Sequence, residues 1–429
     1  MKLTIKNFAK IKSAELQLDG MTVICGDNNT GKSTVGKVLT TVFESLVDLE
    51  KKIINARKDK YETILAEGFS MVPLSRRSAL TANGLKKILD SSLSDADLYK
   101  EDLYKFLENA LPKKRDSHYI KSIVDSIMEV RSIPDSDLKR QLVTNCFAKY
   151  FNSQWTPLNN KKAEKTEITL NFQKQNIALA FPKDKEALLS VTPTDKIAIR
   201  NHAFFIDTPD ILDRVSDAWQ FVIPKDNDLN EIITKILYAE VWENSSKVNP
   251  IDDYLANNKV KQIYEEINAS IKGDFVKDDF SLSFHEDGMS GNVEISNLSK
   301  GMKAFALLLL LLKKHILRDD DILVLDEPEI HLHPAWQVLY AEILVLLQKA
   351  FNLNVLLTTH SSYFLEAIQL SCRKYHFENI LHIYQSVVQS DNGMVILKDD
   401  GPKANDIYAS FMEPLRTLQD LRNELKEQE

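Results

Sequence analysis

The most informative stretch of the chain is VICGDNNTGKST, residues 23–34. Val23-Ile24-Cys25 is a short apolar run, typical of a buried central strand, and it leads into Gly26-Asp27-Asn28-Asn29-Thr30-Gly31-Lys32-Ser33, which matches GxxxxGK[ST]. Helical spacing of apolar residues follows, from Ser33 to about Leu49. In a strand, glycine loop and helix of this kind, backbone N–H groups point inward at an anion beside the positive end of the helix. The sequence therefore predicts a phosphate-binding loop.

Individual side chains of this loop have predictable chemistry. Lys32 can neutralise the charge of the β- and γ-phosphates, and the Ser33 hydroxyl can ligate Mg²⁺. The residues expected to surround the phosphates are Gly26, Asn28, Asn29, Thr30, Gly31, Lys32, Ser33 and Thr34.

A second predicted strand delivers two carboxylates at its end. Ile322-Leu323-Val324-Leu325 is apolar, and Asp326 and Glu327 follow it. When such a pair follows a phosphate loop in the chain, the first carboxylate, Asp326, is expected to hold Mg²⁺. Glu327 is expected to polarise the attacking water, since phosphoryl transfer needs a well-placed acceptor for that water. Alone this pattern is weak, because many strands end in acids.

Two further segments indicate the class. Asn297-Leu298-Ser299-Lys300-Gly301-Met302-Lys303 resembles the LSGGxK signature of ABC-type ATPases, with Lys300 in place of the first glycine. Leu356-Leu357-Thr358-Thr359-His360 resembles their switch-histidine strand, in which the imidazole senses the γ-phosphate. The order of phosphate loop, signature, Asp-Glu pair and histidine is more specific than any one of the four.

The segment from Asp326 to Pro334, DEPEIHLHP, is similar to the DEPExxLHP of the OLD and RecF-like (AAA15-like) branch, as is Thr359-His360-Ser361. The resemblance covers about residues 1–41 and 294–370. It implies ATP and Mg²⁺ as cofactors, and ATP hydrolysis with Lys32, Glu327 and His360 as catalytic residues. In this class the signature serine contacts the nucleotide of the opposite subunit, so Ser299, Lys300 and Gly301 are expected to complete the site of a second copy.

The resemblance and the alternation of strands with helices predict an α/β fold of the ABC-ATPase P-loop type. Its expected parts are a mostly parallel central sheet, an antiparallel β subdomain and a large helical insertion. The predicted divisions are a first ATPase lobe (1–50 and 160–210), the helical insertion (51–159), a helical arm (211–275), a second ATPase lobe (276–400) and a C-terminal helical tail (401–429).

The glutamine that this class usually carries after the strand ending near Asp207 is missing. The chain has Asp207-Thr208-Pro209-Asp210 there, and the next glutamine is Gln220. The residue that completes the metal shell at this point is left open. Two smaller features are also open: His331 and His333 are either helix-start residues or part of a subunit-facing loop, and Trp336 with Tyr340 are either core or interface residues.

The composition of the chain restricts the compartments and binding partners that can be expected for it. The formal net charge is −8, so the whole chain is not a cationic nucleic-acid binder. Three widely spaced cysteines argue against a disulfide framework or a zinc site. The longest apolar run, Ala304 to Leu312, is far shorter than the roughly 20 residues that a bilayer needs. We therefore expect a cytoplasmic protein that does not cross a membrane.

Three functions are compatible with these features. The first is an ATPase subunit that forms homodimers or higher homo-oligomers and serves a separately encoded effector, as in the anti-phage systems PARIS and Septu. Residues 361–429 leave no room for a Toprim domain, so the effector is expected on a separate chain, as a Toprim or HNH nuclease. DNA or a phage protein is the expected trigger. The second is a RecF-like DNA-repair clamp, suggested by basic clusters at 51–52, 57–60, 76–77 and 113–115. The third, a transporter subunit, is disfavoured by the DEPExxLHP segment.

Overall fold

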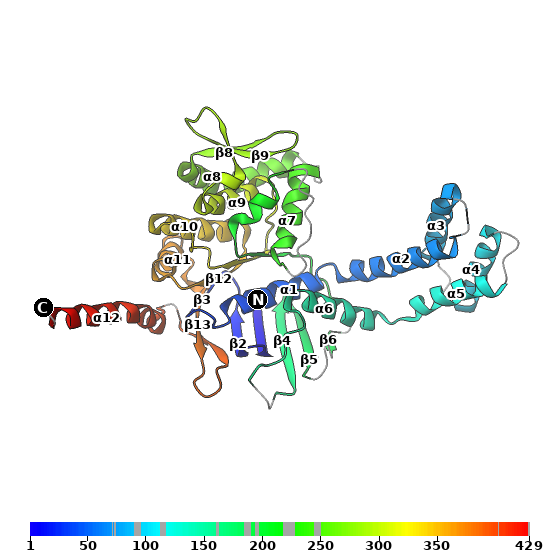
Figure 1. Cartoon of the computed structure of the whole chain (residues 1–429), viewed down its shortest axis with the longest axis horizontal. Coiled ribbons are helices and arrows are strands. Elements are labelled where there is room, and N and C mark those ends of the chain that lie inside the picture. The colour runs from blue at the N-terminus through cyan, green and yellow to red at the C-terminus, as the bar shows by residue number, and fades with distance from the viewer. Residues whose placement is uncertain are drawn as a thin grey trace. The chain divides into compact units, whose positions relative to one another are not determined.

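The computed structural model describes residues 1–70, 72, 74–89, 96–111, 117–159, 163–183, 190–193, 197–217, 228–243, 250–401 and 403–427 (Figure 1). The chain divides into two compact units. Unit 1 comprises Met1–Val47, Val143–Pro193 and Arg200–Glu429, and unit 2 comprises Asp48–Leu142 and Thr194–Ile199. The predicted basic cluster at 113–115 and Gln220 lie outside the described residues, as do the side chains of Arg76 and Arg77.

Unit 1 is built on a large mixed sheet. In the described part of the chain its strands are β1 (Lys2–Phe8), β2 (Ile11–Gln17), β3 (Met21–Cys25), β4 (Lys165–Phe172), β5 (Gln175–Pro182), β6 (Ser190–Thr192), β7 (Ala203–Ile206), β11 (Ile322–Asp326), β12 (Asn354–Thr359), β13 (Leu381–Val388) and β14 (Val395–Asp399). They lie in the order β6-β5-β4-β1-β2-β14-β13-β3-β12-β11-β7. The part from β13 to β7 is parallel, and the part from β6 to β2 is antiparallel. β3 is buried along its whole length, as its apolar sequence predicts for a central strand.

The other described elements of unit 1 are helices and short turns. Those described in unit 1 are α1 (Lys32–Leu46), α7 (Asn230–Tyr238), α8 (Pro250–Ile271), α9 (Lys300–Lys313), α10 (Pro334–Phe351), α11 (Ser362–Lys374) and α12 (Asn405–Glu427), with short turns η1 (Pro209–Arg214), η2 (Ala239–Glu243), η3 (Ile295–Asn297) and η4 (Glu378–Ile380). α6 (Asp135–Phe151) contains the boundary between the two units. No described helix is long and apolar enough to cross a membrane.

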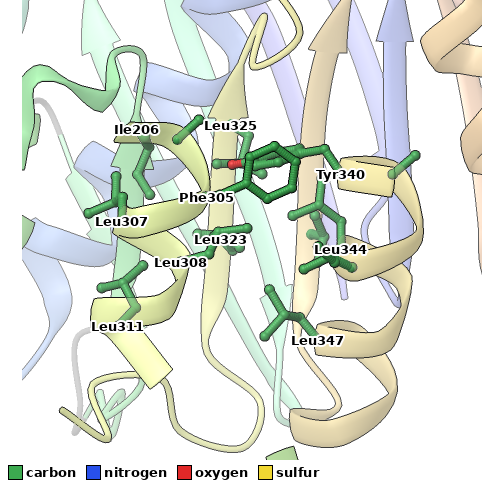
Figure 2. Packing of buried hydrophobic residues seen from close by; sticks show 14 of the residues in the cluster. Ile206, Phe305, Leu307, Leu308, Leu311, Leu323, Leu325, Tyr340, Leu344 and Leu347 are labelled. Atoms are coloured by element: carbon green, nitrogen blue, oxygen red, sulfur yellow. The ribbon is translucent and has the colours of Figure 1, made fainter. Parts of the chain in front are cut away.

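The core beside β11 explains the apolar run of α9. Figure 2 shows side chains of α9 and α10 meeting those of β11, among them Leu323 and Leu325, which are fully buried. The Phe305 ring of α9 packs edge-on against the rings of Trp336 and Tyr340 on α10, with centroids 5.4 and 5.3 Å away. Tyr340 is therefore a core residue, and Trp336 is a partly buried residue that packs against this core.

A second, three-stranded antiparallel sheet contains β8 (Gly273–Lys277), β9 (Leu282–Glu286) and β10 (Asn292–Glu294). β8 begins inside the predicted helical arm (211–275), so the sequence does not predict this strand. β4 and β5 form an antiparallel hairpin, with its turn at Gln173 and Lys174. Both residues adopt positive φ, 46° and 66°, which suits the tight turns that join antiparallel strands.

Unit 2 contains the helices α2 (Leu49–Gly68), α3 (Leu74–Leu89), α4 (Ala96–Ala110) and α5 (Ser117–Ser132), with an apolar core of their own. Arg57, from one of the predicted basic clusters, is held inside this unit. Its guanidinium donates to the carbonyl oxygens of Val130 and Ile133, at 2.7 and 2.6 Å, and pairs with Asp135. Arg57 therefore serves the packing of unit 2.

These observations confirm the predicted fold class, a mixed α/β fold with a large sheet whose central part is parallel and a smaller antiparallel sheet.

Candidate active site

The predicted catalytic segments meet at one edge of the large sheet. Cys25, the last residue of β3, is in register with Thr359 of β12, and Thr358 is in register with Asp326 of β11. The phosphate loop, the Asp-Glu pair and the switch histidine thus follow the carboxyl ends of three adjacent parallel strands. In open α/β sheets this edge is where ligands bind.

The loop from Gly26 to Gly31 needs its glycines. Gly26 has φ 146° and Gly31 has φ 78°, values that side-chain-bearing residues rarely adopt. Gly31 precedes α1 without any side-chain cap, so the first N–H groups of this helix are free for a ligand. Ser33 and Thr34 lie half-buried in the first turn, and Asn28 and Asn29 are exposed.

Lys32 points back into this loop. Its Nζ donates to the carbonyl oxygens of Gly26 and Asp27, each at 2.8 Å, and lies 3.6 Å from Glu327 Oε1. The side chain is almost fully buried, so this ammonium group is paired in a poorly hydrated pocket. A single cation thereby connects the phosphate loop to the Asp-Glu pair.

The two carboxylates are fixed by different contacts. Thr358 Oγ1 donates to Asp326 Oδ1 at 2.5 Å and accepts from the Glu327 N–H at 3.0 Å. Glu327 has φ 50°, an uncommon conformation for a residue with a side chain. Strain of this kind persists only where the surroundings impose it, and it is frequent at functional sites.

His360 follows the end of β12 and faces the second carboxylate. Its Nδ1 lies 3.3 Å from Glu327 Oε1, and its side chain is 44% exposed. Glu327 Oε1 therefore lies between the ammonium group of Lys32 and the ring of His360. The three predicted catalytic residues come together in one chain.

In the part of the chain that the structure describes, the signature residues make no hydrogen bond or ion pair with Lys32, Glu327 or His360. Ser299 caps α9 by accepting a hydrogen bond from the Met302 N–H at 3.2 Å, and it is exposed. Lys300 pairs with Asp210 at 3.0 Å. Gly301 lies so close to His331 that a Cβ there would be 3.1 Å from the His331 carbonyl oxygen. Within the described residues, no hydrogen bond or ion pair joins Ser299, Lys300 or Gly301 to the phosphate loop.

His331 and His333, which follow the Asp-Glu pair in the chain, have different surroundings. The imidazole Nδ1 of His333 accepts from the Ala335 N–H at 3.3 Å, so His333 caps α10 as a helix-start residue. His331 lines a small pocket of about 40 Å³ together with Asp207, Asp326 and Glu327.

Asp207 occupies the point where a glutamine is missing. Ile206, the last residue of β7, is in register with Leu325, so Asp207, directly after β7, and Asp326, the last residue of β11, lie at neighbouring strand ends. The Asn230 side-chain amide donates to Asp207 Oδ1 at 2.7 Å. Partial burial raises the pKa of the Asp207 carboxyl group, although one side of this group is open to solvent.

The donor set fits a hard cation. Ser33, Asp326 and Asp207 supply oxygens only, which is what Mg²⁺ prefers. Among the described residues no group of three His, Cys, Asp or Glu side chains could hold a metal ion by itself. In proteins Mg²⁺ commonly takes one or two carboxylates and completes its shell with phosphate oxygens and water.

Comparison with known proteins identifies the family. The family model described as AAA ATPase domain matches residues 1–365. The chain belongs to the AAA ATPase domain family. No curated protein sequence matches this ATPase-domain chain.

Solved structures similar to this ATPase-domain chain include SMC heads. The SMC head domain from Thermotoga maritima shares 13% identity, with 93% of this chain and 97% of that chain covered and a TM-score of 0.40. The Smc head domain with an extended coiled coil bound to the C-terminal domain of ScpA, derived from Pyrococcus furiosus, shares 12% identity, with 98% of each chain covered and a TM-score of 0.43.

Proposed function

We propose that the chain binds ATP with Mg²⁺ at the edge formed by β3, β11 and β12, and that Glu327 polarises the water that attacks the γ-phosphate. The observation that carries the proposal is the convergence of Lys32 and His360 on Glu327 Oε1, at 3.6 and 3.3 Å. Mg²⁺, held by Ser33, Asp326 and Asp207, would neutralise phosphate charge when bound.

Lys32 has a double role in this proposal. In the described structure its ammonium group binds two loop carbonyls and lies near Glu327. A triphosphate offers this cation ionised acceptors in place of two neutral carbonyl oxygens, so both partners of each hydrogen bond would then carry charge. Once Lys32 turns to the β- and γ-phosphates, the Glu327 carboxylate is free to accept a proton from water.

We further propose that two copies complete each ATP site. Ser299 lies exposed at the N-terminus of α9, a 14-residue helix, and makes no bond with the phosphate loop of its own chain within the described residues. Helix N-termini favour phosphate groups. A two-fold dimer would bring this helix start to the γ-phosphate held by the partner, and such an interface is self-complementary.

Mixing two inactive variants tests this arrangement. Lys32→Ala destroys the phosphate-loop half of a site, and Ser299→Arg blocks the signature half. If sites form between chains, a mixed dimer keeps one intact site, and the mixture should recover about a quarter of the wild-type rate, because half of the dimers are mixed and each has one working site. No recovery in the mixture, with both variants folded and the mixed dimer shown to form, would contradict the shared site.

We propose that ATP-dependent dimerisation switches a separately encoded effector, a nuclease or toxin of anti-phage defence. The support is the similarity of DEPEIHLHP and Thr359-His360-Ser361 to the OLD and RecF-like branch. Tagged wild-type and Glu327→Gln chains, expressed with neighbouring genes and purified with and without ATP, should retain the effector in a nucleotide-dependent way. Retention of duplex DNA alone, with steep loss of affinity as salt rises, would instead support the RecF-like clamp.

A further inference from the structure

A buried glutamate lies next to the strand end that carries the candidate catalytic residue His360. Glu329, two residues after Glu327, is only 2% exposed. Its Oε1 accepts hydrogen bonds from the Thr359 hydroxyl at 2.5 Å and from the His360 N–H at 3.3 Å. Its Oε2 is buried and has no hydrogen-bond partner among the described residues. Burying a carboxyl group with an unsatisfied oxygen is costly, so packing alone does not account for this residue.

The contacts of Glu329 and Glu327 act on the same histidine. Glu329 holds the backbone N–H of His360, and Glu327 lies 3.3 Å from its ring nitrogen. Both carboxylates belong to the segment between β11 and α10, whereas His360 follows β12. The position of the imidazole relative to Glu327 is therefore fixed by two contacts from one segment.

A second set of contacts supports this arrangement from α10. Gln337 Oε1 accepts from the Ser361 hydroxyl at 3.0 Å, and its Nε2 donates to the Leu332 carbonyl oxygen at 3.2 Å. The Ser361 N–H in turn donates to Thr359 Oγ1 at 3.0 Å. Residues on both sides of His360 are thus bound to the segment that carries Glu327 and to the helix that follows it.

We propose that Glu329 is a positioning residue for ATP hydrolysis, which fixes the backbone of the switch histidine so that its ring stays against Glu327. The inference rests on the proposed roles of Glu327 and His360. It concerns the chemical step only, because Glu329 has no described contact with the phosphate loop.

The test compares two replacements of Glu329 in the full-length chain. Glu329→Leu removes the acceptor, and we expect kcat to fall about 100-fold, the scale of effect that follows from a displacement of about 1 Å in a catalytic group. ATP affinity, measured by calorimetry, should stay within about twofold, since Lys32 and the loop are untouched. Glu329→Gln keeps an acceptor oxygen and should retain kcat within about threefold of wild type, because it still satisfies both donors. Glu366→Gln, an exposed glutamate on α11, is the matched control.

A structural readout separates positioning from a loss of stability. In protein labelled with ¹³C-histidine, the His360 ring signal, assigned with His360→Gln, should shift in Glu329→Leu and stay in place in Glu329→Gln. If Glu329→Leu does not fold, Thr359→Val removes the hydroxyl donor to the same carboxylate and should lower kcat about tenfold, with Thr359→Ser restoring it.

The outcomes distinguish this inference from the proposed function. A wild-type kcat in Glu329→Leu and Thr359→Val, with His360→Gln and Glu327→Gln inactive, would overturn the positioning role alone. Wild-type hydrolysis in His360→Gln and Glu327→Gln would overturn the proposed function and the inference that rests on it. Loss of kcat in Glu329→Leu with an unmoved His360 signal would also overturn the positioning role.

Discussion

The hydroxyl group of Thr30 lies 2.6 Å from that of Ser386, although 356 residues separate them in the chain. Thr30 Oγ1 also donates to the Asp27 carbonyl oxygen at 2.7 Å. Ser386 belongs to β13, which pairs with β3 so that Gln385 is in register with Cys25. A strand from the C-terminal part of the chain therefore forms one wall of the phosphate loop and anchors its backbone.

This wall makes Gly26 the least replaceable residue of the loop. A Cβ at Gly26 would lie 2.2 Å from Ser386 Oγ, and the φ of 146° is itself unfavourable for alanine. We expect Gly26→Ala to destabilise the fold by about 1–3 kcal/mol and to abolish measurable ATP binding. Thermal unfolding and calorimetry with ATP would measure the two effects.

A second substitution relieves part of the clash. Ser386→Gly in the Gly26→Ala background removes Ser386 Oγ but leaves the Ser386 carbonyl oxygen 2.9 Å from the added Cβ and the φ of residue 26 unchanged. Part of the lost stability should therefore return while ATP binding stays weak. Full ATP binding by the Gly26→Ala chain would show that the loop does not need this conformation. Gly291→Ala is the control, since a Cβ there meets nothing within 4 Å.

The sequence was sufficient for those parts of the site that lie on short, contiguous segments. Gly26 to Thr34 carries its own strand, loop and helix start, and Asp326 and Glu327 follow an apolar run, so local pattern and chemistry suffice to predict them. Their positions agree with the structure because parallel strands bring their carboxyl ends to one edge.

Residues that act through tertiary contacts could not be found in this way. Ser386 carries no local signal, because only the pairing of β13 with β3 brings it to the loop. Lys10 likewise meets the loop only in the fold, where its Nζ donates to Asn29 Oδ1 at 2.9 Å. Glu329 stands inside the predicted DEPE segment, yet its contacts with Thr359 and His360 depend on how β11 and β12 end. The short strand β8 was missed because its five residues contain a glycine and two charged residues.

Lys32 is predicted to be essential for nucleotide binding. Lys32→Ala removes the cation that meets the phosphates, takes this donor from the Gly26 carbonyl oxygen and leaves the Asp27 carbonyl oxygen with the Thr30 hydroxyl group. We expect ATP binding to fall below detection in calorimetry, a loss of at least about 100-fold. Lys6→Ala, an exposed lysine on β1, should bind like wild type. ATP affinity in Lys32→Ala within a few-fold of wild type would remove the phosphate loop from the proposed site.

Glu327 is predicted to govern hydrolysis and not binding. Glu327→Gln keeps the size of the side chain but cannot accept a proton from water, so we expect kcat to fall by about 10²–10⁴ while ATP binding persists. Because ATP would then remain between the protomers, the variant should elute as a dimer in size-exclusion chromatography with ATP and as a smaller species without it. Normal hydrolysis by Glu327→Gln would assign the water-polarising role to another residue, and Glu366→Gln controls for the loss of one surface charge.

The three cysteines are predicted to differ in reactivity because they differ in burial. Cys25 ends β3 directly before the phosphate loop and is fully buried, and burial raises the pKa of its thiol far above the ordinary value. Burial also raises the pKa of the Cys372 thiol to about 12, so at pH 8 a fraction on the order of 10⁻⁴ is the reactive thiolate. Cys146 is only partly buried, with its Sγ 3.8 Å from the Thr41 carbonyl oxygen. With Ellman's reagent at pH 8, one thiol should therefore react first in the native protein, Cys146→Ser should remove this phase, and all three should react in 6 M guanidinium. Equally fast modification of Cys25 in the native chain would mean that β3 is not enclosed by its neighbouring strands, and the phosphate loop would then lack the rigid strand on which its geometry depends.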